Sequence, residues 1–215
     1  MPKAKPYRVL IVDDHAIVRA GLKQILADVP DIEVAAEADC ASQALRLARQ
    51  ESWDVVLMDI SMPDRSGLEA LELLRREHPG IKVLMLSMHR ETQYAVRALK
   101  TGAAGYLNKQ SAPAQLVDAI LTVASGKKYI SAEVAQELAS QVSGEREAAP
   151  HEGLSNREYQ TLCLLASGLT VSAIAEQLSL SVKTISMYRT RLLTKMRMTN
   201  NAELTHYAIK HGLVD

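Results

Sequence analysis

The stretch Asp54-Val-Val-Leu-Met-Asp59, followed by Ile60-Ser-Met-Pro-Asp-Arg-Ser-Gly67, decides the fold of this 215-residue chain. Four consecutive apolar residues between two aspartates are typical of a strand that is buried on both faces, as in the middle of a parallel sheet. The proline and glycine that follow predict a loop before a helix that begins near Ser66. Asp59 is therefore expected at the carboxyl end of a central strand, where open α/β sheets bind ligands. Taken alone, an aspartate at this position more often caps a turn.

Other predicted strands also end in polar side chains. Strand 8–12 is followed by Asp13 and Asp14, strand 82–86 by Ser87, and strand 104–107 by Lys109. If the sheet is parallel, these groups meet at one edge. Three carboxylates repel one another unless a divalent cation neutralises them, and ligation by oxygen alone suits Mg²⁺. Together with a lysine and a hydroxyl, they fit phosphoryl transfer to a carboxylate.

The spacing of apolar residues predicts helices between the strands. Helices are expected at 15–28, 41–51, 66–77 and 113–125, and a further strand is expected at 33–37. This alternation predicts a parallel sheet with helices on both faces. The pattern alone leaves the strand order open.

Composition limits the location of the protein. No apolar run approaches the roughly 20 residues that a membrane span needs, and the N-terminus lacks the apolar core of a signal peptide. A cytoplasmic protein with no membrane contact is expected. Cys40 and Cys163 are far apart in sequence, which favours reduced core thiols over a disulfide.

The C-terminal part is basic although the whole chain has zero net charge. Residues 171–178 and 182–197 are predicted to form two helices joined by a short turn, the helix-turn-helix unit. The second helix contains no acid, which favours nucleic acid over the alternative of a protein-binding helix. Its predicted outward face suits major-groove reading, with flanking positions better placed for phosphate contact. The DNA-binding candidates are Lys183, Ser186, Met187, Arg189, Thr190, Arg191 and Lys195.

These motifs resemble the two-component response regulators of the NarL/FixJ family. The resemblance rests on Val12-Asp-Asp-His-Ala-Ile-Val-Arg19, Asp59 and Gly105-Tyr-Leu-Asn-Lys109, and on LuxR-type segments such as Leu154-Ser-Asn-Arg-Glu158 and Lys183-Thr-Ile185. It implies an α/β receiver, a flavodoxin-like five-stranded parallel sheet in the order 2-1-3-4-5, followed by a small all-α four-helix helix-turn-helix domain. The expected parts are a receiver at 1–126, a linker at 127–153 with a helical segment near 132–142, and a DNA-binding domain at 154–215.

By this resemblance, Asp59 accepts a phosphoryl group from a sensor histidine kinase. Mg²⁺ is expected on Asp13, Asp14, Asp59 and the backbone carbonyl of Ser61. Lys109 would pair with the phosphoryl group, and Ser87 and Tyr106 would form the switch. The expected result is a homodimer that binds double-stranded DNA, in a regulator whose own catalysis is limited to slow phosphotransfer and dephosphorylation.

The sequence departs from the family pattern in a few places. Gln110 follows Lys109 where many receivers have proline, Ser172-Ala173 replace a usual Lys-Glu pair, and Tyr188 replaces a common histidine. The last two departures make a target DNA sequence borrowed from the family unreliable.

The sequence leaves two other functions open. A metal-dependent phosphatase could also use an aspartate nucleophile, but such enzymes generally place a second acid two residues later, where this chain has Ser61. A DNA-binding protein whose receiver works through protein contacts, unphosphorylated, is the other alternative.

Overall fold

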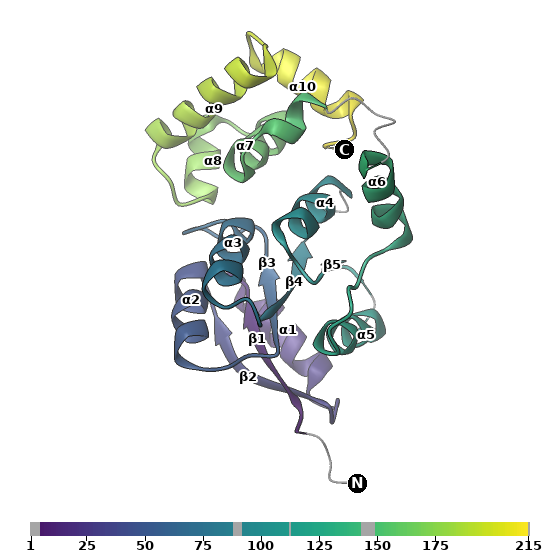
Figure 1. The fold of residues 1–215 in the computed structure, drawn as a ribbon. Helices are drawn as coiled ribbons and strands as arrows, with labels where there is room; N and C mark the ends of the chain where they lie inside the picture. The colour runs from purple at the N-terminus through teal and green to yellow at the C-terminus, as the bar shows by residue number, and fades with distance from the viewer. Residues whose placement is uncertain (1–4, 88–91, 112, 143–148, 215) are drawn as a thin grey trace. The chain divides into compact units, whose positions relative to one another are not determined.

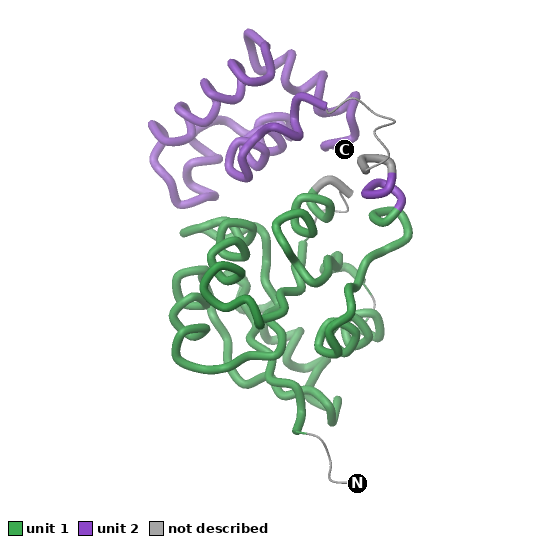
Figure 2. The backbone as a smooth tube through the Cα atoms, viewed as in Figure 1, with its two compact units in different colours: residues 1–135 green, residues 136–215 purple. Residues whose placement is uncertain are grey.

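The computed structural model describes residues 5–87, 92–111, 113–142 and 149–214. The chain divides into two compact units, residues 1–135 and 136–215, which are coloured separately in Figure 2. Residues 143–148 of the predicted linker lie outside the described residues.

The first unit alternates strands and helices, as the sequence predicts (Figure 1). The strands are β1 (Tyr7–Val12), β2 (Ile32–Ala38), β3 (Val55–Asp59), β4 (Lys82–Ser87) and β5 (Gly105–Asn108). The helices are α1 (Ala16–Leu26), α2 (Ala41–Gln50), α3 (Gly67–Glu77), α4 (Thr92–Thr101) and α5 (Pro113–Ala124), and α6 (Ala132–Val142) crosses the boundary between the units. The sheet is parallel with the order β2-β1-β3-β4-β5, which confirms the predicted order.

Both faces of the sheet are covered by helices (Figure 1). One face carries Val9, Leu57 and Leu84, which pack in a single cluster with Leu26 of α1 and Ile120 of α5. The alternating strand residues point to the other face, which α2, α3 and α4 cover. Burial on both faces explains the uninterrupted apolar run of β3.

The chain after α5 pairs with the edge of the sheet. The Tyr129 N–H donates to the Ala104 carbonyl at 3.0 Å, and the Tyr106 N–H donates to the Tyr129 carbonyl at 3.4 Å. These bonds form a parallel bridge between Gly105 and Tyr129. We call residues 127–134 the strap. These residues are part of the predicted linker, whereas in the structure Tyr129 pairs with β5 and the segment 127–134 belongs to the first unit.

The second unit is helical. It contains the 3-10 helix η1 (Pro150–Gly153) and the helices α7 (Asn156–Ala166), α8 (Val171–Gln177), α9 (Val182–Met196) and α10 (Asn201–Lys210). Ser155 and Glu158 form a capping box at the start of α7, and the side chains of Thr170, Ser181 and Asn200 cap the three later helices. The core includes the fully buried side chains of Tyr159, Ile185 and Leu204.

Sequence reasoning missed η1. His151 within it is buried, and its Nδ1 lies 2.8 Å from the Tyr207 hydroxyl oxygen. Pro150 at the first position was the available signal, because proline favours the first turn of a helix.

Candidate functional site

The carboxylates predicted at the sheet edge lie together. Asp13 and Asp59 are buried at the ends of the neighbouring strands β1 and β3, and Asp14 lies beside them. One ligand atom each from Asp13, Asp14, His15 and Asp59 lies within 4.8 Å of the others. Adjacent strand ends produce this cluster, because the parallel register sets Val12 beside Met58.

Lys109 joins the two buried carboxylates. Its Nζ lies 2.6 Å from Asp13 Oδ2 and 3.0 Å from Asp59 Oδ1, and its side chain is 7% exposed. The Lys109 backbone N–H donates to the Ser87 carbonyl at 2.7 Å, which fixes the residue beside β4. The Lys109–Gln110 peptide bond is trans, as are the other peptide bonds within the part of the chain that the structure describes.

Burial and charge perturb the protonation of this cluster. Burial raises the pKa of Asp59 to about 6, and the Asp13 carboxylate adds to the rise, while Lys109 and the Ser61 backbone N–H oppose it. Burial lowers the pKa of Lys109, but the carboxylates of Asp59 and Asp13 outweigh it, so that the pKa is raised overall. One ammonium thus faces two buried carboxylates, and Asp14 belongs to the same cluster.

The donor chemistry of this cluster fits a hard divalent cation. Asp13, Asp14 and Asp59 offer carboxylate oxygens at one place, and Lys109 alone leaves their negative charge in excess. Mg²⁺ prefers carboxylate ligands and keeps several of its waters. The acidic pocket is therefore consistent with magnesium binding.

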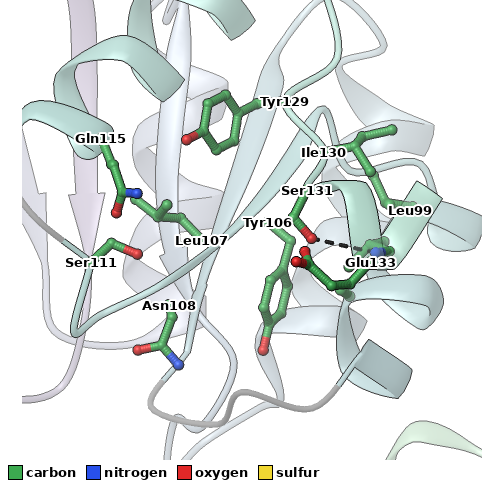
Figure 3. A pocket seen from close by; sticks show the side chains of 12 residues that line it. Leu99, Tyr106, Leu107, Asn108, Ser111, Gln115, Tyr129, Ile130, Ser131 and Glu133 are labelled. Carbon is green, nitrogen blue, oxygen red and sulfur yellow. Dashed lines mark hydrogen bonds between the residues drawn. The ribbon is translucent and has the colours of Figure 1, made fainter. Parts of the chain in front are cut away.

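Ser87 and Tyr106 have different surroundings. Ser87 is buried at the end of β4, one residue beyond the partner of Asp59 in the strand register. Tyr106 is half-buried on β5 and lines a cavity of about 470 Å³ between α4 and the strap. Figure 3 shows its ring between Asn108 on one side and Leu99 and Ser131 on the other. Movement of the Tyr106 ring would therefore change the packing of the strap residues that line the same cavity.

The loop after Asp59 is fixed by contacts that sequence reasoning did not identify. Asp64 accepts the backbone N–H groups of Ala41 and Ser42 at 3.1 and 2.9 Å, so it caps α2 from another loop. Gly67 approaches the Asp59 backbone so closely that a Cβ there would lie 2.0 Å from the Asp59 carbonyl oxygen. No local pattern reveals either contact, because each depends on the packing of α2, β3 and α3.

The predicted DNA-contacting residues lie on α9. Ile185, Leu192 and Met196 form its buried side, while Lys183, Ser186, Met187, Thr190 and Arg191 are exposed. The α8-turn-α9 arrangement is a helix-turn-helix, in which the second helix presents an outward face. The exposed residues match the outward face predicted from the sequence.

Arg189 and Lys195, the two flanking residues predicted to contact phosphate, are held by neighbouring helices. Lys195 Nζ donates to Glu158 Oε2 on α7 at 2.6 Å, and Arg189 Nε donates to Asn201 Oδ1 on α10 at 2.6 Å. Their predicted roles stay predictions. The ion pair with Glu158 argues against a phosphate contact by Lys195, because a DNA phosphate would compete with the buried Glu158 carboxylate for the Lys195 ammonium.

Comparison with known proteins agrees with both units. The family model of the response regulator receiver domain matches residues 9–121, and that of the bacterial regulatory proteins of the luxR family matches residues 152–208. The chain is 44% identical to the response regulator UvrY of Escherichia coli (strain K12) over 206 residues, covering 95% of this chain and 94% of that one. It is 40% identical to the response regulator GacA of Pseudomonas aeruginosa over 209 residues, covering 97% and 98%.

A solved structure is similar over most of its length. It is RcsB from Salmonella enterica serovar Typhimurium bound to promoter rprA in the presence of the phosphomimetic BeF₃⁻. The TM-score is 0.65 at 25% identity, with 94% of this chain and 98% of that chain covered.

The fold and the site define a receiver-type phosphoacceptor protein with a helix-turn-helix unit. The chain belongs to the response regulators that join a receiver domain to a LuxR-type DNA-binding domain, the NarL/FixJ family. It is a phosphorylation-dependent DNA-binding transcriptional regulator. Among the described residues, no helix has both the length and the apolar character that crossing a membrane requires.

Proposed function

We propose that Asp59 is the phosphoacceptor and that a sensor histidine kinase is the donor. The observation that carries this proposal is the position of Lys109, whose ammonium bridges Asp13 and Asp59 at the end of the central strand. An Asp59 oxygen attacks phosphorus, the bond from phosphorus to the donor imidazole breaks, and an acyl phosphate forms on Asp59. The ammonium of Lys109 then pairs with the new phosphoryl oxygens.

Asp13, Asp14, Asp59 and the Ser61 carbonyl would hold Mg²⁺, which supplies positive charge to the transferring phosphoryl group. The residues of the chain do the remaining work. Asp13 holds Lys109 at its present position, and the Ser61 N–H holds the Asp59 carboxylate. Self-catalysed phosphotransfer and dephosphorylation are slow in this arrangement, because Ser61 stands where a phosphatase would have its second acid. One phosphoryl group per chain is the expected stoichiometry.

The switch consists of Ser87 and Tyr106. The Ser87 hydroxyl moves toward the phosphoryl group, and the Tyr106 ring turns into the space that this movement vacates. Phosphorylation favours this state over the unphosphorylated one by population shift. The half-buried position of Tyr106 beside the cavity and the strap supports this role.

The receiver at 1–126 would act through the segment 127–153 on the DNA-binding domain at 154–215. The phosphorylated protein would pair as a homodimer and bind double-stranded DNA with the outward face of α9. The solved structure of the related RcsB with a promoter and BeF₃⁻ supports this coupling of phosphorylation to DNA binding. A protein with a kinase and DNA as partners works in the cytoplasm.

The test is DNA binding by the full chain, at fixed salt, with genomic fragments that the protein itself selects. A small phosphodonor with Mg²⁺ should tighten binding and give dimeric complexes. Asp59→Asn should abolish the response, whereas the control Asp28→Asn, at an exposed carboxylate, should keep it. Specific binding that ignores the donor would remove the phosphorylation switch, and many turnovers of donor per chain would identify a phosphatase.

A further inference from the structure

A hydrogen bond joins α9 to α10 beside the predicted DNA-contacting face. The Nε of Arg189 donates to Asn201 Oδ1 at 2.6 Å, and Asn201 is the first residue of α10. Both residues are half-buried. Arg189 follows the fully buried Ile185 by four positions, so its Cα lies near the inner side of α9. The direction of its long side chain therefore decides where the guanidinium reaches the surface.

The partner of Arg189 is uncharged. An arginine that donates to an amide oxygen keeps its positive charge, and a contact through Nε leaves the N–H groups of both Nη atoms for other acceptors. Lys195, the other flanking cation of α9, instead donates to the carboxylate of Glu158. Lys195 is thus held by an opposite charge, whereas Arg189 is held by a neutral group.

The first turn of α10 also contains a carboxylate, Glu203, which is bound within its own turn. Glu203 accepts the backbone N–H of Thr199 at 2.7 Å, the Thr199 hydroxyl at 2.8 Å and the side-chain amide of Asn200 at 3.1 Å. The hydrogen bonds from Thr199 lower the pKa of Glu203. Arg189 forms no ion pair with any residue that the structure describes, so its charge is not compensated by the protein.

We propose that Asn201 is a positioning residue for DNA binding, which directs the guanidinium of Arg189 toward a phosphate of the DNA backbone without neutralising it. This inference rests on the proposed DNA-binding face of α9. The hydrogen bond orders the arginine before DNA arrives, so that less conformational entropy is lost on binding. The Nη groups then donate to phosphate oxygens, for which the planar guanidinium is well suited. Of the two flanking cations, Arg189 is the phosphate contact.

A purely structural tie between the two helices is the competing interpretation. In that case the hydrogen bond only fixes α10 to α9, and a carboxylate would serve as well as an amide. Asn201→Asp separates the two interpretations, because aspartate has nearly the same shape and accepts the same hydrogen bond but adds a negative charge. The positioning role predicts weaker DNA binding, since an ion pair to Arg189 competes with the phosphate. The structural tie predicts no such specific loss.

The experiment titrates the full chain, treated with a phosphodonor and Mg²⁺, against a DNA fragment that it selects, at several salt concentrations. Asn201→Asp should lower the affinity and reduce the slope of the logarithm of the binding constant against the logarithm of salt concentration by about one. The matched control is Asn156→Asp, which makes the same change at the first residue of α7 and should leave the slope unchanged. Amide hydrogen exchange in α9 and α10 checks that each variant keeps its fold.

A double-mutant cycle gives a second, independent test. Arg189→Ala should also reduce the slope by about one. Asn201→Ala alone should weaken binding, but added to Arg189→Ala it should cause no further loss, because the asparagine acts only through the arginine.

The outcomes separate this inference from the proposed function. Equal effects of Asn201→Asp and Asn156→Asp, or a further loss when Asn201→Ala is added to Arg189→Ala, would overturn the positioning role. An unchanged slope in Arg189→Ala would also overturn it, and the DNA-binding face of α9 would still stand if Arg191→Ala weakens binding. If neither arginine substitution weakens binding, the proposed face itself fails. A loss of slope in Asn201→Asp but not in Asn156→Asp, with hydrogen exchange as in wild type, establishes the inference.

Discussion

The ammonium of Lys109 lies closer to Asp13 than to Asp59, at 2.6 Å from Asp13 Oδ2 and 3.0 Å from Asp59 Oδ1. Asp13 is fully buried, so the short contact compensates its charge where water does not reach. Lys109 is therefore held more closely by Asp13 than by the proposed phosphoacceptor, Asp59.

Replacing Lys109 by methionine should destabilise the first unit by about 3 kcal/mol in the absence of divalent cations, because it leaves two buried carboxylates without their counter-charge. Mg²⁺ should restore part of the loss by supplying positive charge at the same place. Urea unfolding followed by the fluorescence of Trp53, the single tryptophan, measures both effects. Equal stability of the variant and wild type would show that the ion pairs contribute no net stability.

Gly67→Ala should destabilise the first unit by about 3 kcal/mol and impair phosphorylation of Asp59. The added Cβ would overlap the Asp59 carbonyl oxygen, which belongs to the backbone and moves only if Asp59 itself moves. The control is Gly80→Ala, because no atom lies within 4 Å of a Cβ at that position. Urea unfolding and stoichiometric labelling by a phosphodonor give the two readouts. Similar effects of the two substitutions would contradict the close approach.

Asp64→Ala should cost the first unit about 1–2 kcal/mol, since the carboxylate caps two backbone N–H groups of α2. Burial raises the pKa of Asp64, but the hydrogen bonds from Ser42, Ala41 and Arg65 outweigh it and lower the pKa overall. Asp64→Asn should recover only part of the loss, because an amide accepts at one atom only. The exposed Asp28 provides the control Asp28→Ala. Hydrogen exchange at the start of α2 should increase in the Asp64 variants alone.

Glu158→Gln should destabilise the second unit by about 1 kcal/mol at pH 7, because the amide cannot pair with Lys195 as an ion. Burial raises the pKa of Glu158, but hydrogen bonds from Lys195 and Ser155 outweigh it and lower the pKa overall. The ionised carboxylate therefore stabilises the folded state above its ordinary pKa, and this contribution is lost as the pH falls through the lower, folded-state pKa.

The measurement for Glu158→Gln is amide hydrogen exchange in α7 and α9 between pH 7 and pH 3, with the variant and wild type compared at each pH. The difference should shrink toward the acid end of the range. Lys195→Met should show the same loss of stability at pH 7 and only a small change in DNA affinity. A loss of DNA affinity without a loss of stability would assign Lys195 to phosphate contact instead.

Arg191→Ala should weaken DNA binding. It should also reduce the slope of the logarithm of the binding constant against the logarithm of salt concentration by about one, as expected for the loss of one phosphate contact. Arg191 is exposed on α9, outside the buried side formed by Ile185 and Leu192. The control is Lys210→Ala, which removes a charge at the end of α10. Titration at several salt concentrations checks the prediction. An unchanged salt slope for Arg191→Ala would place the DNA on another face.

The sequence by itself determined the strands of the first unit, most of the helices and the edge of the sheet at which the site lies. The apolar run before Asp59 identifies a strand buried on both faces, and the carboxylates after β1 and β3 then share one edge in any parallel arrangement. Ser155 and Glu158 predict the start of α7, because a capping box is formed within four residues. Such features follow from local periodicity and capping, which the order of residues encodes directly.

Only the tertiary structure decided the contacts between distant segments. Asp64 caps a helix 22 positions earlier, Lys195 pairs with Glu158 37 positions away, and Tyr129 lies along the edge of β5. These contacts depend on how helices and strands pack and in which register they meet. A charged or aromatic residue has the same local pattern whether it faces solvent or a distant partner, so its sequence neighbourhood does not reveal the pairing.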